Sequence, residues 1–194
     1  LAWCHPVLHQ RIMDEKQRRP ELKLVVIDPR LTPTAAMADL HLPIKSGSDI
    51  LLFNGLLDHL AKHWKINSNS QIDGLEAALA SAEIDAQKLA DTGLDIDALW
   101  QFFQLFANTD KVVSLFSQGI NQSSQGSDQC NAIINCHLAS GKIGREGCGP
   151  FSVTGQPNAM GGREVGALAN TLASHMEFNN PEQHQTLSEF WQTD

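Results

Sequence analysis

The stretch Leu22-Lys23-Leu24-Val25-Val26-Ile27-Asp28-Pro29-Arg30 decides the fold that we predict for this chain. Its residues 24–27 form a continuous apolar run with no polar alternation. Strands that are buried on both faces of a parallel sheet have such runs, whereas half-exposed strands alternate apolar and polar residues. Asp28-Pro29 is then typical of a turn. We therefore predict a buried parallel strand over residues 22–27.

A second apolar strand is predicted at Lys111–Phe116, and a short extended edge at Leu40–Ile44, where Pro43 cannot donate to a ladder. The remaining apolar residues recur mostly with helical spacing. Helices are expected over residues 6–19, 48–64, 71–82, 86–91, 95–107, 128–140 and 164–176. Strands that alternate with helices favour an α/β fold with a parallel sheet and flanking helices.

Composition limits the class of protein. The chain has 194 residues with 14 basic and 22 acidic side chains, which give a formal net charge of -8. This balance argues against a nucleic-acid-binding surface, which needs a basic footprint. No apolar run approaches the roughly 18–20 residues that span a bilayer. Because the chain begins at Leu1 without Met, we expect it to be an internal piece of a longer protein.

The four cysteines show no C-x-x-C spacing and are Cys4, Cys130, Cys136 and Cys148. Without a secretory signal, such thiols indicate a reducing compartment and favour a cytoplasmic location. Two H-x-x-x-H pairs, His5/His9 and His59/His63, place two rings on one helix face. Structural zinc is the alternative there, but neither pair has a nearby third ligand in the sequence, and we predict no metal ligands.

Polar residues follow both predicted strands at their carboxyl ends, where ligands bind in open α/β sheets. Asp28 is placed to bond a nucleotide ribose, and the alternative is a turn-forming Asp before Pro. The run from Ser117 to Gly126 is rich in amides and hydroxyls and almost without charge. Such groups both donate and accept, so we expect a loop that binds an uncharged heterocycle, the alternative being a flexible polar loop.

The segment from Pro150 to Gly166 is rich in Gly and Pro, which interrupt strands and helices. We therefore expect neither a regular strand nor a helix interior there. Its polar side chains Thr154, Gln156, Asn158 and Arg163 are typical of a ligand-binding loop. A cluster of surface turns is the alternative.

Part of this segment, Gly155-Gln156-Pro157-Asn158-Ala159-Met160-Gly161-Gly162-Arg163-Glu164-Val165-Gly166, resembles a loop of molybdopterin-dependent oxidoreductases. Within that family it is most similar to bacterial assimilatory nitrate reductases. Three further stretches agree in family order over nearly the whole chain: Trp3-Cys4-His5-Pro6, Asp28-Pro29-Arg30 and Gly119-Ile120-Asn121-Gln122.

The resemblance implies a Rossmann-like, three-layer parallel sheet that binds bis-molybdopterin guanine dinucleotide. Residues 1–155 are then a cofactor-binding domain whose first strand precedes Leu1, and residues 156–194 begin the return into an adjacent α/β domain. The cofactor-binding residues implied are Cys4, Asp28, Arg30, Thr32, Gly47, Ser48, Asp49, Gln118, Gly119, Gln122 and Gln156. Asp49 would bind guanine, although by local sequence Ser48 or Asp49 is a natural helix N-cap.

The resemblance also implies a substrate. Formate dehydrogenases of the family have arginine at the position of Thr154, whereas nitrate reductases have threonine, and Arg163 matches an arginine of the substrate funnel. The implied catalytic residues are therefore Thr154 and Arg163, with nitrate as substrate and an electron-donor protein or subunit as partner. Arg163 alternatively forms an ion pair with Glu164 or another carboxylate.

The ligands of molybdenum and of a 4Fe-4S cluster would lie upstream of this chain, so the chain alone is expected to be inactive. A fragment of a formate dehydrogenase and a non-catalytic nucleotide-binding module remain the alternatives.

Overall fold

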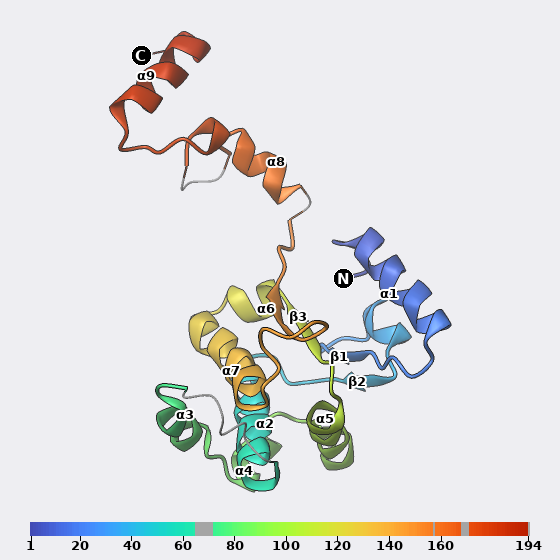
Figure 1. Ribbon diagram of the computed structural model, residues 1–194. Coiled ribbons are helices and arrows are strands. Elements are labelled where there is room, and N and C mark those ends of the chain that lie inside the picture. Colours follow the sequence, from blue (N-terminus) through green and yellow to red (C-terminus); the bar gives the residue numbers. More distant parts are fainter. Residues whose placement is uncertain (65–71, 157, 168–170, 194) are drawn as a thin grey trace. The chain divides into compact units, whose positions relative to one another are not determined.

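The computed structural model describes residues 1–64, 72–156, 158–167 and 171–193. These residues form two compact units, Leu1–Val153 and Thr154–Asp194. The first unit contains all the β-structure of the described residues, and the second contains short helices. Figure 1 labels the elements of both units.

The strands of the first unit form two parallel pairs (Figure 1). Strand β1 (Val25–Ile27) pairs with β2 (Leu40–Leu42), with Val26 opposite His41. Strand β3 (Val113–Phe116) pairs with β4 (Gly149–Ser152), with Leu115 opposite Phe151. The predicted strands at 22–27 and 111–116 and the short edge at 40–44 are confirmed, and the chain is α/β with parallel pairing.

Burial of the strands differs from the prediction. All three residues of β1 are half-buried, and β3 alternates between exposed and half-buried residues. Val113 and Leu115 keep 49% and 38% of their surface exposed. The prediction of burial on both faces was wrong for this chain, because each strand has one neighbouring strand and one face of β3 is left partly uncovered among the described residues.

Most predicted helices are confirmed with small shifts at their ends. The first unit contains α1 (Pro6–Arg18), the 3-10 turn η1 (Ala35–Met37), α2 (Asp49–His63), α3 (Leu75–Ala82), α4 (Ala86–Ala90), α5 (Ile96–Asn108), α6 (Gln118–Asn121) and α7 (Gly126–Ala139). Sequence signals mark their ends as expected. Pro6 opens α1, Asp95 caps α5 by accepting from Asp97 N and Ala98 N, and Gly141 takes a φ of 67° just beyond α7.

The core of the first unit lies where α2 packs against α5 and α7. Leu52, Leu56, Phe103 and Ile133 are at most 1% exposed there. Gly55 allows α2 to approach its neighbours closely, since a Cβ at this position would lie 2.7 Å from Leu89 Cδ1. Burial of these side chains is the main favourable contribution to folding of this unit.

A buried polar contact joins α7 to β3 under this core. His137 is fully buried, and its Nδ1 donates to the carbonyl oxygen of Lys142 at 3.3 Å. Its Nε2 therefore accepts from Ser114 Oγ at 2.8 Å. Burial lowers the pKa of His137 to about 4, so the ring is neutral near pH 7.

Two predictions about the polar segments were wrong: the absence of a strand or helix in residues 150–166, and a loop after β3. Residues 149–152 form strand β4, although Pro150 lies within it. Proline is tolerated because, among the described residues, β4 has a neighbouring strand on one side only, so the missing N–H of Pro150 costs no ladder bond there. The run after β3 is not a loop throughout, because it contains the helical turn α6 and the start of α7 at Gly126.

The second unit departs most from the prediction. Helix α8 spans Ala159–Glu164, the 3-10 turn η2 spans Ala173–His175, and α9 spans Pro181–Trp191. The predicted helix over 164–176 was wrong, because α8 ends at Glu164 and Gly166 takes a φ of 72° that L side chains rarely adopt. Residues 168–170 of that prediction lie outside the described residues.

Candidate functional site

The carboxyl ends of β1 and β2 form the first part of the site. The two strands are parallel, so the loops that leave them start at the same edge. Asp28 directly follows β1, and its backbone N–H donates to Leu42 O at 3.2 Å. His41 Nε2 donates to Asp28 O at 2.8 Å. This pairing fixes the position of the backbone from which the Asp28 side chain extends.

The Asp28 carboxylate stabilises the local turn, since Oδ1 accepts from Arg30 N at 2.9 Å. The turn-forming interpretation of Asp28 is thus confirmed, and binding of a ribose by the same carboxylate stays a prediction. Thr32 Oγ1 accepts from Ala35 N at 3.3 Å and opens η1 in the same manner. The side chain of Arg30 is exposed next to this turn.

The first residues of the chain lie at this same edge. Leu1 N and Ala2 N both donate to Thr34 Oγ1, at 3.2 and 3.0 Å. Cys4 follows in the turn before α1 and is exposed. The structure therefore brings the loop of Cys4 to the segment that holds Thr32.

The loop after β2 delivers Gly47, Ser48 and Asp49 to the start of α2. Gly47 has a φ of 85°, which only glycine adopts at low cost. Ser48 occupies the N-cap position, but its Oγ donates to Lys45 O at 2.6 Å and makes no capping bond. Asp49 is half-buried in the first turn of α2, and burial raises the pKa of its carboxyl.

The carboxyl ends of β3 and β4 form the second part of the site. Gln118 and Gly119 lie in α6, Gln122 directly follows it, and all three residues are exposed. Asn121 Nδ2 donates to Ser152 Oγ at 2.8 Å and thereby joins α6 to the end of β4. The exposed amides of Gln118 and Gln122 thus stand on a fixed helical turn.

Ser117 is a residue of this edge that we did not single out from the sequence. Its Oγ is buried and has no hydrogen-bond partner among the described residues. A buried hydroxyl without a partner is costly, unless a bound group supplies one. Its place directly after a predicted strand was the sequence signal that could have selected it.

The remaining predicted residues belong to the second unit. Thr154 Oγ1 accepts from Gln156 N at 3.4 Å, and both residues are exposed. Arg163 lies near the end of α8 with its side chain exposed. It forms no ion pair with Glu164 or another described carboxylate, so its charge is available to a ligand.

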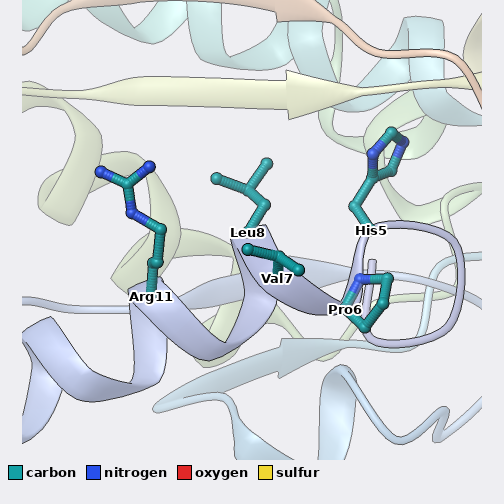
Figure 2. Close-up of a pocket in the computed structure, with 5 residues that line it drawn as sticks. All are labelled: His5, Pro6, Val7, Leu8 and Arg11. Carbon is teal, nitrogen blue, oxygen red and sulfur yellow. The ribbon is translucent and has the colours of Figure 1, made fainter.

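Two features outside these edges were also considered as sites. A shallow hollow of about 370 Å³ runs along the first turns of α1, lined by His5, Pro6, Val7, Leu8 and Arg11 (Figure 2). The rings of His59 and His63 lie 4.9 Å apart, but His59 is 6% exposed and packs against Trp100 and Phe103. His59 is therefore part of the aromatic packing between α2 and α5.

Within residues 1–64, 72–156, 158–167 and 171–193, no cluster of three or more His, Cys, Asp or Glu side chains could hold a metal ion. In the same residues, no helix has the length and apolar character that a membrane span requires.

Comparisons with known proteins agree with one family. A family model for molybdopterin oxidoreductase matches residues 1–192. A nitrate reductase from Shewanella frigidimarina is 50% identical over 200 residues, which cover 100% of this chain and 21% of that protein. A nitrate reductase from Klebsiella oxytoca is 49% identical over 191 residues, covering 98% of this chain and 22% of that protein. A periplasmic nitrate reductase from Desulfovibrio desulfuricans is 33% identical over 206 residues, which cover 97% of this chain and 27% of that protein.

Among solved structures, acetylene hydratase from Pelobacter acetylenicus superposes with a TM-score of 0.62 at 21% identity, over 69% of this chain and 19% of that chain. At this identity the likeness concerns the fold. The chain spans about a fifth of the length of its two most similar relatives named above. Because the family model covers nearly all of its residues, the chain belongs to the molybdopterin oxidoreductase family.

Proposed function

We propose that this chain is an internal, cofactor-binding part of a molybdenum-dependent nitrate reductase. The observation that carries the proposal is 50% identity to a nitrate reductase over the full chain, together with Thr154 and Arg163 in an exposed polar segment. The reaction is the reduction of nitrate to nitrite and water by two electrons and two protons. The alternative of a plain nucleotide-binding module leaves the match to residues 1–192 unexplained.

The residues of the strand ends fit a molybdopterin guanine dinucleotide. Ser117 Oγ is an unpartnered, buried donor at the carboxyl end of β3, and the neighbouring amides of Gln118 and Gln122 can both donate and accept. The Asp49 carboxylate can accept from the adjacent N–H groups of guanine. We assign Gln118 and Gln122 to the pterin and Asp28 with Asp49 to the guanosine.

The bound molybdenum centre supplies the redox chemistry, and the protein supplies orientation and charge. Arg163 attracts nitrate and orients it, because a guanidinium fork matches a planar oxyanion. Thr154 occupies the position where formate dehydrogenases of the family have an arginine. The neutral hydroxyl of Thr154 therefore favours nitrate over formate. Gln156, which is tied to Thr154 through its backbone, contributes an amide to the pterin.

The finer assignment is nitrate assimilation in the cytoplasm. It is supported by the short spacing between Gln156 and Arg163 and by the four free cysteines. We further propose a 4Fe-4S cluster and an electron-donor partner, both bound outside residues 1–194.

The test is a turnover assay on a longer protein that contains this chain, with a reduced viologen dye as electron donor. We expect nitrite to form with two equivalents of viologen oxidised for each nitrite, and no reduction of oxidised viologen by formate. Formate-dependent dye reduction without nitrite formation would assign the protein to formate oxidation. Loss of both activities in a protein that retains molybdenum would refute either assignment.

A further inference from the structure

The loop that joins α7 to β4, residues 140–148, reaches the amino ends of β3 and β4. Cys148 directly precedes β4, and Asp110 lies in the turn before β3, so both are at the ends of the strands opposite to the candidate site. Cys148 Sγ donates to Asp110 O at 3.4 Å, and Cys148 N donates to Arg145 O at 3.1 Å. Arg145 in turn pairs with Asp110 Oδ1 at 2.7 Å. These contacts hold the thiol in a defined place, with 8% of the residue exposed.

Lys142 is a buried cation in the same loop. The residue is 3% exposed, and its Nζ lies 5.1 Å from the centre of the Phe106 ring. In the part of the chain that the structure describes, Nζ takes part in no hydrogen bond and no ion pair. A buried ammonium is costly unless a negative charge compensates it. The surroundings of Lys142 therefore favour an anionic group beside its Nζ.

Cys148 is placed to supply that negative charge. Burial lowers the pKa of Lys142, and the neighbouring Cys148 side chain opposes this change. The hydrogen bond with Asp110 raises the pKa of Arg145, and Cys148 adds to this effect. Two cations, one buried and one exposed, thus act on one thiol. Cysteines that react as nucleophiles lie in such electropositive, partly exposed surroundings.

The other three cysteines provide references within the same chain. Cys4 is exposed. Cys130 is half-buried, and its Sγ donates to Asn121 Oδ1 at 3.2 Å. Cys136 is fully buried, its Sγ donates to Phe53 O at 3.2 Å, and burial raises the pKa of its thiol. A buried thiol of this last kind is inert, so burial alone does not make a cysteine reactive.

We propose that Cys148 is a site of reversible oxidation by hydroperoxides, with Lys142 stabilising the negative charge on its sulfur. The sulfur attacks one oxygen of hydrogen peroxide, so an S–O bond forms as the O–O bond breaks. The thiol proton goes to the departing hydroxide, which leaves as water. The sulfur loses the two electrons that the peroxide gains, and the product is a sulfenic acid.

The charge of Lys142 acts before and after this step. It stabilises the thiolate that attacks the peroxide, and its N–H groups then donate to the oxygen of the ionised sulfenic acid. Two equivalents of an external thiol restore Cys148 and release water and a disulfide. The proposal is independent of the reduction of nitrate.

The test treats the 194-residue chain, and a longer protein that contains it, with hydrogen peroxide and dimedone, a reagent that traps sulfenic acids. Trypsin places Cys148 alone in the peptide 146–163, Cys4 in the peptide 1–11, and Cys130 with Cys136 in the peptide 112–142. We expect the adduct to form on Cys148 roughly fivefold or more faster than on Cys4. Cys136 should stay unlabelled, and dithiothreitol added before dimedone should prevent the label on Cys148.

Lys142→Met tests the role of the charge, because methionine fills a similar volume without an ammonium. We expect labelling of Cys148 to slow to about the rate of Cys4. Lys88→Met is the control, since Lys88 is exposed on α4, and it should leave the rate unchanged. If circular dichroism shows that Lys142→Met does not fold, Arg145→Gln removes the exposed cation instead and should slow labelling roughly twofold.

Cys148→Ser should abolish the adduct on the peptide that contains position 148. An adduct that persists there, or a Cys148 that stays reduced while Cys4 is labelled, would overturn the proposal. Equal labelling rates at Cys148 in the wild type and in folded Lys142→Met would overturn it as well, because the buried ammonium would then have no part in the reaction.

Discussion

Arg163 is the residue on which the proposed binding of nitrate depends most. Its exposed guanidinium has no ion pair among the described carboxylates, and it stands on a short helix behind two glycines. We expect Arg163→Ala in the longer enzyme to lower kcat/KM for nitrate by roughly tenfold or more, equivalent to about 1.4 kcal/mol. Arg163→Lys should recover part of this loss, since the point charge returns without the fork.

Steady-state kinetics at several salt concentrations test this prediction. Arg145→Ala is the matched control, because it removes an exposed arginine that is paired with Asp110 at 2.7 Å. Molybdenum content should be the same in all three variants. Wild-type kinetics in Arg163→Ala, with only its thermal stability reduced, would show that the arginine is structural.

Asp49 tests the guanosine side of the proposal. Hydrogen bonds between a carboxylate and guanine contribute on the order of 1.5–3 kcal/mol to the free energy of binding of the dinucleotide. We expect Asp49→Ala in the longer enzyme to lose the dinucleotide faster on dilution and heating, measured by the guanine that remains bound. Asp95→Ala is the control, because Asp95 caps α5 through two N–H groups and lies outside the proposed site. Equal retention in the two variants would show that Asp49 serves the helix alone.

His137 couples stability to pH. Burial lowers its pKa from the ordinary 6.5 to about 4, so the unfolded chain binds a proton that the folded chain does not between these values. The stabilisation of the folded chain by the neutral ring is fully present above about pH 6.5. As pH falls towards 4, the free energy of unfolding decreases by up to roughly 3 kcal/mol. Charged Lys142, whose carbonyl accepts from the ring, also disfavours the protonated form.

Urea unfolding of the chain at a series of pH values measures this effect. His137→Gln should flatten the decline of unfolding free energy between pH 6.5 and 4. Ser114→Ala keeps the buried ring and should retain the decline at lower overall stability. The account of His137 fails if the slope of wild type and His137→Gln is the same.

At the scale of elements, apolar patterns located strands and helices, but not their packing. The continuous apolar run at 24–27 predicted β1, and the run at 112–116, which is apolar except for Ser114, predicted β3. The burial of these strands was overestimated. An apolar run indicates that a strand can be buried in a sheet, but it does not show which elements cover that strand among the described residues. Asp28 was selected because strand ends place polar residues, and Thr32 was selected through the family resemblance alone. Ser117 was not selected because its burial depends on distant packing.

Glycine was the least reliable predictor of turns, because glycine also occurs where two parts of the chain pack closely together. Strand β4 was missed on account of Gly149 and Pro150, which are tolerated in a strand with one neighbour. In α8, a Cβ at Gly161 would lie 2.6 Å from the Asn158 side chain, so this glycine permits a contact within a helix. Neither role can be recognised from composition alone.

The junction of α6 and α7 offers a test at this scale. A Cβ at Gly126 would lie 2.4 Å from the carbonyl oxygen of Asn121, the residue that joins α6 to Ser152. We expect Gly126→Ala to lower the unfolding free energy by roughly 2 kcal/mol or more. Gly119→Ala is the control, because a Cβ there meets nothing within 4 Å and alanine favours a helix. Urea unfolding that ranks the two variants in the reverse order would contradict this view of the junction.

At the scale of the whole molecule, the chain spans about a fifth of its nitrate reductase relatives, and its described residues contain no cluster that could hold a metal. In the function that we propose, this part supplies strand-end contacts to the guanosine and pterin, with Thr154 and Arg163 for the anion. The ligands of molybdenum and of the iron–sulfur cluster would then come from a longer protein.

Elemental and nucleotide analysis of the longer protein tests this central claim most directly. Molybdenum is measured by mass spectrometry, and guanine is released by acid from the same purified sample. The account predicts one molybdenum and two guanines per longer protein, and neither in the 194-residue chain. A longer protein that reduces nitrate without molybdenum, or a 194-residue chain that binds one molybdenum, would contradict it.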